Sequence, residues 1–152
     1  MACTLNNGRK EPCKDVVGGI KAVYFVDFQP LTMTLDSSSL AFENFHAADG
    51  STDVEGYKYE MRSGASMTSN INSSRETGTT FFETTLELTL RKLSHNDNKE
   101  LKILAHGRPH IFVLDNNDNI MLVGQEYGCE VTGGTLVTGN AMGDLSGYTL
   151  TF

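Results

Sequence analysis

Cysteine and histidine are the residues in this chain that could bind a metal or carry redox chemistry. The three cysteines, Cys3, Cys13 and Cys129, are an odd number at irregular spacing, and the sequence has no C-x-x-C pair. Cys3 and Cys13 could bind a metal together with a distant histidine, but free thiols in a reducing compartment explain the same residues. The spacing favours free thiols.

The four histidines give no metal-binding pattern. His46 has no partner at a metal-ligand spacing, which favours a packing role. His95, His106 and His110 lie loosely together in sequence. A glycine and a proline separate His106 from His110, so the two would not share one helical face. A metal site is therefore not expected here.

An Asp/Asn-rich segment invites comparison with a calcium loop. Asp115, Asn117 and Asn119 occupy loop positions one, three and five, and Glu126 falls at position twelve. Position six is Ile120, where the sharp turn requires glycine, and the flanking segments have the character of strands rather than helices. A β-hairpin turn rich in Asn and Asp explains every residue and is favoured.

The remaining motifs predict no catalysis. Gly18 and Gly19 precede a strand instead of following one, so the geometry of a phosphate-binding loop is missing. The sequence has no GxxxxGK[ST], no HExxH and no serine in a nucleophile elbow. Asn72-Ser73-Ser74 matches a glycosylation acceptor but lacks a secretory signal before it. We therefore expect no enzyme activity, no cofactor and no metal.

Composition indicates a soluble globular protein, expected to be one domain over residues 1–152. Twelve basic against nineteen acidic side chains give a net charge of −7, which argues against a nucleic-acid-binding surface. It does not argue against a surface that DNA slides past without binding. No apolar run approaches a membrane span, and the N-terminus has no apolar signal core. We expect the protein to stay in the cytoplasm or to leave it inside a larger assembly.

The elements that should organise the chain lie in residues 54–90, which predict a long projecting β-hairpin. Residues 55–62 form the outgoing strand, 63–78 a polar tip and 79–90 the returning strand. In the returning strand a period of two indicates one buried face. That face carries Thr80, Phe82, Thr84, Leu86, Leu88 and Leu90.

The tip, residues 64–78, has almost nothing to bury, so it should be mobile or be ordered by a neighbouring subunit. Met67 and Ile71 would then be its anchors. Tyr57, Tyr59 and Phe81 complete the residues expected to form contacts between copies of the chain.

The other elements follow from local patterns. Residues 94–107 predict the one clear helix, with Ser94 and Asp97 as a capping box and Gly107 as a left-handed C-terminal cap. A turn-rich connection is expected over residues 37–53, and residues 1–15 read as an arm that packs on a neighbouring subunit. Strands are expected at residues 16–28, where Ile20, Ala22, Tyr24, Val26 and Phe28 share a face, and at 31–36, 111–114, 120–123, 130–138 and 148–152.

About seven strands and one helix predict a mainly β protein, namely a β-sandwich or flattened barrel with the helix over one open face or end. In the order of its elements the chain resembles the tail tube proteins of tailed bacteriophages and their relatives in contractile injection systems. Residues 139–152 are similar in style to the closing strands of phage virion proteins.

This resemblance implies a structural virion protein of the phage tail, assembled in the host cytoplasm. Six copies would form a ring, and stacked rings would form a tube that conducts DNA without binding it specifically. Its partners would be other copies of the chain and further tail proteins. It would not bind a membrane.

Two other classes stay open. One is a different virion component, such as a capsid decoration protein or a neck or tail-completion protein. The other is a ligand- or carbohydrate-binding β-sandwich, in which Tyr57, Tyr59, Phe81 and Tyr127 would supply the exposed aromatic side chains.

Overall fold

The computed structural model describes residues 8–11, 13–35, 42–47 and 53–152, with side chains omitted for 33–35 and 42–47. The fold is mainly β, with 47% of the residues in strands. In chain order the elements are β1 (Ile20–Val26), β2 (Leu31–Leu35), β3 (Phe42–Ala47), β4 (Gly56–Glu60), β5 (Ala65–Ser74), β6 (Thr79–Arg91), α1 (His95–His106), β7 (His110–Asp115), β8 (Ile120–Val123), β9 (Gly133–Val137) and β10 (Gly147–Thr151).

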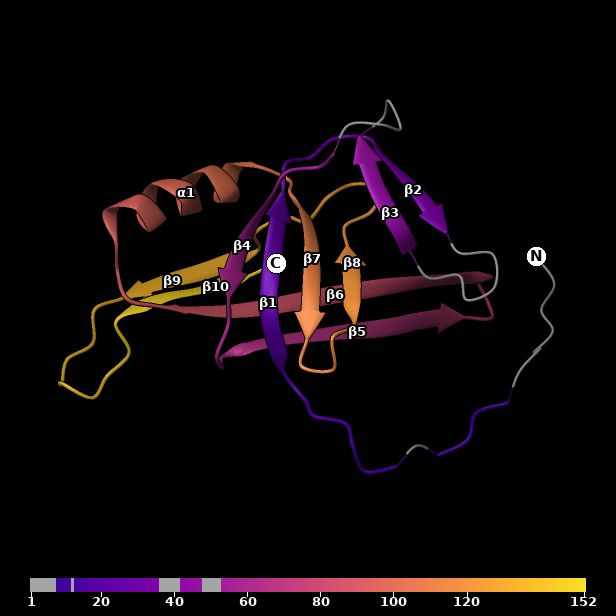
Figure 1. Ribbon diagram of the computed structural model, residues 1–152, viewed down its shortest axis with the longest axis horizontal. Coiled ribbons are helices and arrows are strands. Elements are labelled where there is room, and N and C mark those ends of the chain that lie inside the picture. Colours follow the sequence, from indigo (N-terminus) through magenta and orange to yellow (C-terminus); the bar gives the residue numbers. More distant parts are fainter. Residues whose placement is uncertain (1–7, 12, 36–41, 48–52) are drawn as a thin grey trace.

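Two four-stranded antiparallel sheets form a sandwich, as the sequence predicts. The first sheet has the order β4-β1-β7-β8 and the second the order β5-β6-β10-β9, while β2 and β3 pair separately. The strands of the first sheet run across those of the second (Figure 1). The buried core between the sheets consists of Ile20, Val23, Phe25, Met61, Leu86, Leu88, Ile111, Val113, Cys129 and Phe152.

Strand β1 is central, as expected, because it pairs with β4 on one side and β7 on the other. Both of its faces are buried: Val23 and Phe25 belong to the core, and Ala22 and Val26 are also inaccessible. A register irregularity after Ile20 places this residue with Val23 and Phe25 in the core. A strand buried on both faces reads as a continuous apolar run, which residues 22–26 are, whereas Lys21 is exposed.

The helix has the predicted extent, but its ends differ from the expected motifs. Ser94 is the N-cap residue without a side-chain capping hydrogen bond, and Gly107 is extended (φ −90°, ψ 176°) rather than left-handed. The Gly107 N–H still bonds to the Ile103 carbonyl. An extended residue suits this position because β7 begins only three residues later. The helix lies over β9 and β10, beside β4 (Figure 1), and buries Leu101.

The expected hairpin over residues 54–90 is wrong in its outgoing strand. β4 pairs with β1 in the first sheet, with Tyr59 opposite Val23. The partner of β6 is β5, over ten residue pairs from Ala65–Leu88 to Ser74–Thr79. The chain passes from one sheet to the other through Gly64, whose positive φ of 84° favours glycine.

The expected polar tip is therefore mostly strand β5. Backbone pairing with β6 satisfies its N–H and C=O groups whatever its side chains are. Hydroxyl pairs add to this across the strands, with Thr84 donating to Ser69 at 3.0 Å and a 3.1 Å bond joining Ser73 and Thr80. The connection expected over residues 37–53 is likewise corrected in part, because β3 pairs with β2.

Candidate assembly surface

The β5–β6 hairpin has one end in the core and one end outside it. Leu86 and Leu88 are 1% and 0% exposed, respectively. Further along the same face, Ile71 and Phe82 are opposite each other in register and are 66% and 67% exposed. The face that forms the core thus continues outward as an uncovered apolar pair.

The opposite face of the hairpin also presents an aromatic ring. Phe81 is 57% exposed and is opposite Asn72. Two adjacent phenylalanines therefore point to opposite sides of a two-stranded ribbon, and both are in contact with solvent. Exposed apolar groups gathered on one element are typical of interaction sites, whereas isolated ones are ordinary.

Among the residues that the structure describes, no strand pairs with the outer edge of β5. β5 is the terminal strand of its sheet, and its ten residues include no charged side chain and no proline. Protein edge strands are usually protected by such residues, by bulges or by shortness. A long, uncharged edge is consequently suited to strand pairing with a second chain.

The five residues predicted for contacts between copies fall into two groups. Met67, Ile71 and Phe81 lie together on the hairpin, with Met67 half-buried against the core. Tyr57 and Tyr59 lie on β4 in the other sheet: Tyr57 is exposed, and Tyr59 makes an edge-to-face contact with Phe25 at 5.0 Å.

Sequence reasoning missed Phe82 as a surface residue. Its position in the alternating pattern is that of Leu86 and Leu88, which assigned it to the buried face. The assignment of the face is right, but the first sheet does not cover this part of it. Strand periodicity carries no signal for where the covering sheet ends.

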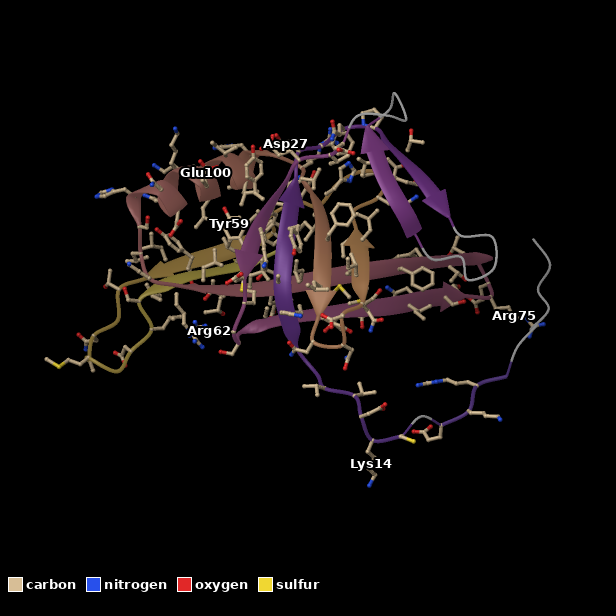
Figure 2. All side chains as sticks on the ribbon, in the orientation of Figure 1. Lys14, Asp27, Tyr59, Arg62, Arg75 and Glu100 are labelled. Carbon is tan, nitrogen blue, oxygen red and sulfur yellow. The ribbon has the colours of Figure 1, made fainter. Side chains whose placement is uncertain are left out.

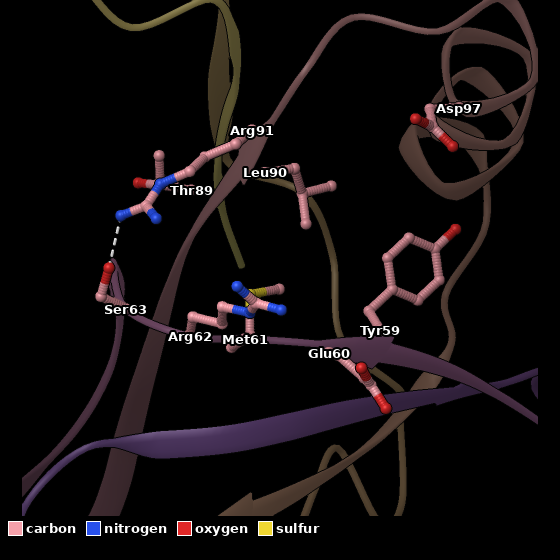
Figure 3. Close-up of a pocket in the computed structure, with 9 residues that line it drawn as sticks. All are labelled: Tyr59, Glu60, Met61, Arg62, Ser63, Thr89, Leu90, Arg91 and Asp97. Atoms are coloured by element: carbon pink, nitrogen blue, oxygen red, sulfur yellow. Dashed lines mark hydrogen bonds between the residues drawn. The ribbon is translucent and has the colours of Figure 1, made fainter.

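A cavity of about 310 Å³ lies between β4, the end of β6 and the helix (Figure 3). Tyr59 lines it, and burial raises the pKa of its phenol, with smaller contributions from the Glu100 and Asp97 carboxylates. The Arg91 guanidinium donates to the Ser63 hydroxyl, so this serine is engaged with a cation rather than with a base. The lining is charged and open, and its groups form no nucleophile–base pair.

The described cysteines and His110 lie at different places in the fold. Cys13 is exposed, and Cys129 is buried in the core, where desolvation raises the pKa of its thiol to about 11. Cys3 lies outside the described residues. His110 is buried, with Nδ1 2.7 Å from the Gly124 carbonyl and Nε2 2.9 Å from the Gln29 carbonyl, so neither ring nitrogen is free for a metal.

The other histidines do not join His110. His95 and His106 are the first and last residues of α1, and His46 lies in β3, where its side chain is outside the described part. Among the residues that the structure describes, no three His, Cys, Asp or Glu side chains gather in a group that could hold a metal ion.

The Asp/Asn-rich segment is the turn of the β7–β8 hairpin, as predicted. The Asp115 carboxylate accepts hydrogen bonds from the backbone N–H groups of Asn117 and Asn119, both at 2.8 Å. Hydrogen bonds from Asn119 and then Asn117 lower the pKa of Asp115. Asn116 bonds to the carbonyls of Gly18 and Gly19, so the glycine pair is attached to this turn.

Compared with protein-family models, curated proteins and solved structures, the chain shows no significant match to any of them. Within the described part of the chain, no helix has the length and apolar character needed to cross a bilayer.

Proposed function

We propose that this protein is a structural subunit that assembles with copies of itself, and is not an enzyme. The observation that carries the proposal is the outer part of the β5–β6 hairpin, where Ile71, Phe81 and Phe82 are exposed beside an uncharged strand edge. A lone domain gains nothing from leaving these groups in water. Contact with a second copy would bury them.

The particular assembly we propose is a tube of stacked rings, like that of the tail tube proteins of tailed bacteriophages, which the order of elements resembles. The net charge of −7 supports a conduit that repels DNA phosphates instead of binding them. In this proposal the protein is part of the virion tail, is assembled in the host cytoplasm, and contacts other tail proteins at the ends of the tube.

Sedimentation velocity over a range of protein and salt concentrations, followed by negative-stain electron microscopy, tests the proposal. We expect concentration-dependent association and tubes or rings in the images. Isolated rings without stacking would favour a neck or decoration protein. A monomer at every concentration and salt would overturn self-assembly and leave the ligand-binding sandwich, whose aromatic residues can then be tested by glycan binding.

A matched pair of variants locates the contact. Ile71→Ser combined with Phe82→Ser removes the exposed apolar pair, and Ile103→Ser removes an apolar side chain of similar exposure on the helix. The first variant should weaken association by about 10- to 100-fold, in the range of buried interface anchors. The helix variant should associate as the parent does.

A further inference from the structure

The segment before β1 is attached to the β7–β8 turn through Val17. Val17 donates its N–H to Asn117 Oδ1 at 2.9 Å and accepts from Asn117 Nδ2 at 2.8 Å. The described residues of 8–17, here called the arm, are exposed throughout, and Figure 1 shows the arm as a separate trace outside the two sheets. Val16 and Val17 are 68% and 59% exposed. Both side chains line an open groove of their own chain, together with Met67 and Met121, but most of their surface stays in contact with solvent.

The arm differs in charge from the rest of the chain. Residues 8–17 contain three basic and two acidic side chains, whereas residues 18–152 contain nine basic and seventeen acidic ones. The contrast is sharpest against the C-terminal part, because no lysine or arginine follows Arg108. Lys14 points away from the body in Figure 2 and is available to a partner.

A groove of about 330 Å³ lies between β6 and segments of that C-terminal part. Its floor is apolar and includes the buried residues Leu86, Cys129 and Phe152, and the exposed Phe82 ring belongs to its wall. Glu130 lines it with an exposed side chain. The groove therefore offers an apolar surface beside a carboxylate.

We propose that this groove binds the arm of a second copy of the chain. The chain bends at Lys14, where Asp15 donates its N–H to the Cys13 carbonyl at 2.9 Å. Once this turn opens into an extended segment on binding, Lys14 and Val16, which are two residues apart, face one surface together. Val16 would pack against Phe82 and the groove floor, while Lys14 would pair with Glu130. The proposal rests on the self-association proposed above and identifies one pair of surfaces that produces it.

The same copy cannot make this contact. Its Val17 is held at Asn117, in the turn at one end of β8, while the groove begins at Val123, at the other end. The four residues of β8 separate the two by on the order of 13 Å. In its own chain Val16 lines a different groove, whose lining includes Met67 and Met121 but neither Phe82 nor Glu130.

Cross-linking between differently marked copies of the full chain tests the proposal. One copy keeps Cys13 as its only thiol, with Cys3→Ser and Cys129→Ala. The other carries Glu130→Cys as its only thiol, with all three native cysteines replaced. A mixture treated with a short bismaleimide can join these two thiols only between copies. A third copy with Glu100→Cys, an exposed carboxylate position on the helix, measures random collision (Figure 2).

We expect Cys13 to cross-link to the Glu130→Cys copy at least about tenfold faster than to the Glu100→Cys copy, because a specific complex holds two thiols at high local concentration. Equal rates, in a protein that still associates by sedimentation, would overturn the arm proposal and leave self-assembly standing. A single chain that carries Cys13 together with Glu130→Cys and cross-links only internally would overturn it as well.

A charge exchange gives a second readout that needs no cysteine. Lys14→Glu and Glu130→Lys should each weaken association, and the double variant should recover it, because the ion pair is restored in reverse. If the double variant instead loses the sum of the association free energies that the two single variants lose, the two side chains do not contact each other. A chain that never associates in any form would instead remove the proposed function itself.

Discussion

The inner and outer parts of the β5–β6 hairpin share one ladder of hydrogen bonds but have opposite surroundings. In the inner part, Leu88 pairs with Ala65 and is fully buried under the first sheet. In the outer part, Phe82 pairs with Ile71 on the same face and is two-thirds exposed. Strand pairing and burial therefore differ in extent: the pairing runs along the whole hairpin, whereas the buried face ends partway along it.

This contrast explains why the outer part is the better candidate for assembly. Its backbone is already ordered by pairing within the chain, so binding would not have to offset the entropy of ordering it. Its apolar side chains still gain from leaving water. The outer part of the hairpin therefore combines an ordered backbone with exposed apolar side chains, and both favour binding.

The largest expected difference comes from truncating one residue in each part. Leu88→Ala should lower the free energy of unfolding by about 2–5 kcal/mol, through lost burial and the cavity left behind. Phe82→Ala should change it by less than about 0.5 kcal/mol in the monomer, because the ring is already in water. Chemical denaturation at a protein concentration below the onset of association measures both. Equal losses of unfolding free energy in the two variants would show that the first sheet covers both parts of the hairpin equally.

Cys129 tests the boundary between the two parts, because it lines the same groove as the buried Leu86 and the exposed Phe82. Burial raises the pKa of this thiol from 9.0 to about 11. The unfolded chain therefore loses this proton at lower pH than the folded chain, so the stabilisation is complete below pH 9 and is lost as the pH rises towards 11.

The expected loss from this group is at most about 2–3 kcal/mol. Denaturant unfolding of the parent and of Cys129→Ala at several pH values between 8 and 11 measures it. The gap between the two curves should narrow with rising pH. The raised pKa of Tyr59 acts in the same direction but is common to both proteins. A constant gap would mean that the thiol is as hydrated as the outer part of the hairpin.

Removing the outer part altogether should also have only a small effect on stability. Thr68 and Thr85 are opposite each other in register, so Asn-Gly in place of residues 69–84 gives a two-residue hairpin loop. Thermal unfolding should shift by only a few degrees, because no residue of the buried core is lost. Association should fall sharply. A shortened protein that still forms tubes of normal length would contradict the assembly role of the hairpin.

Local patterns predicted several elements correctly. The period of two in residues 79–90 identified β6 and the face that holds Leu86 and Leu88. The helix was found from its apolar stripe and flanking residues, although neither cap has the predicted geometry. The Asp115–Asn119 turn was recognised because Asp and Asn bond to nearby backbone groups. Each of these features depends on residues close together in sequence.

The pairing partners were decided by the tertiary structure. The alternation in residues 55–62 showed a strand but not which strand it joins, and Tyr59 packs on Phe25 in the first sheet instead of opposite β6. Residues 65–74 have too few apolar side chains to predict a strand, yet β6 supplies the hydrogen-bond partners that make them one.

By itself the sequence determined the conformation of most segments and the face that each strand would bury. How far the burial extends was decided only in three dimensions. Phe82 and Leu88 have the same place in the alternating pattern, but only Leu88 lies where the two sheets overlap. The physical reason is that a strand's faces are set by its own pleat, whereas its cover comes from residues far away in the chain.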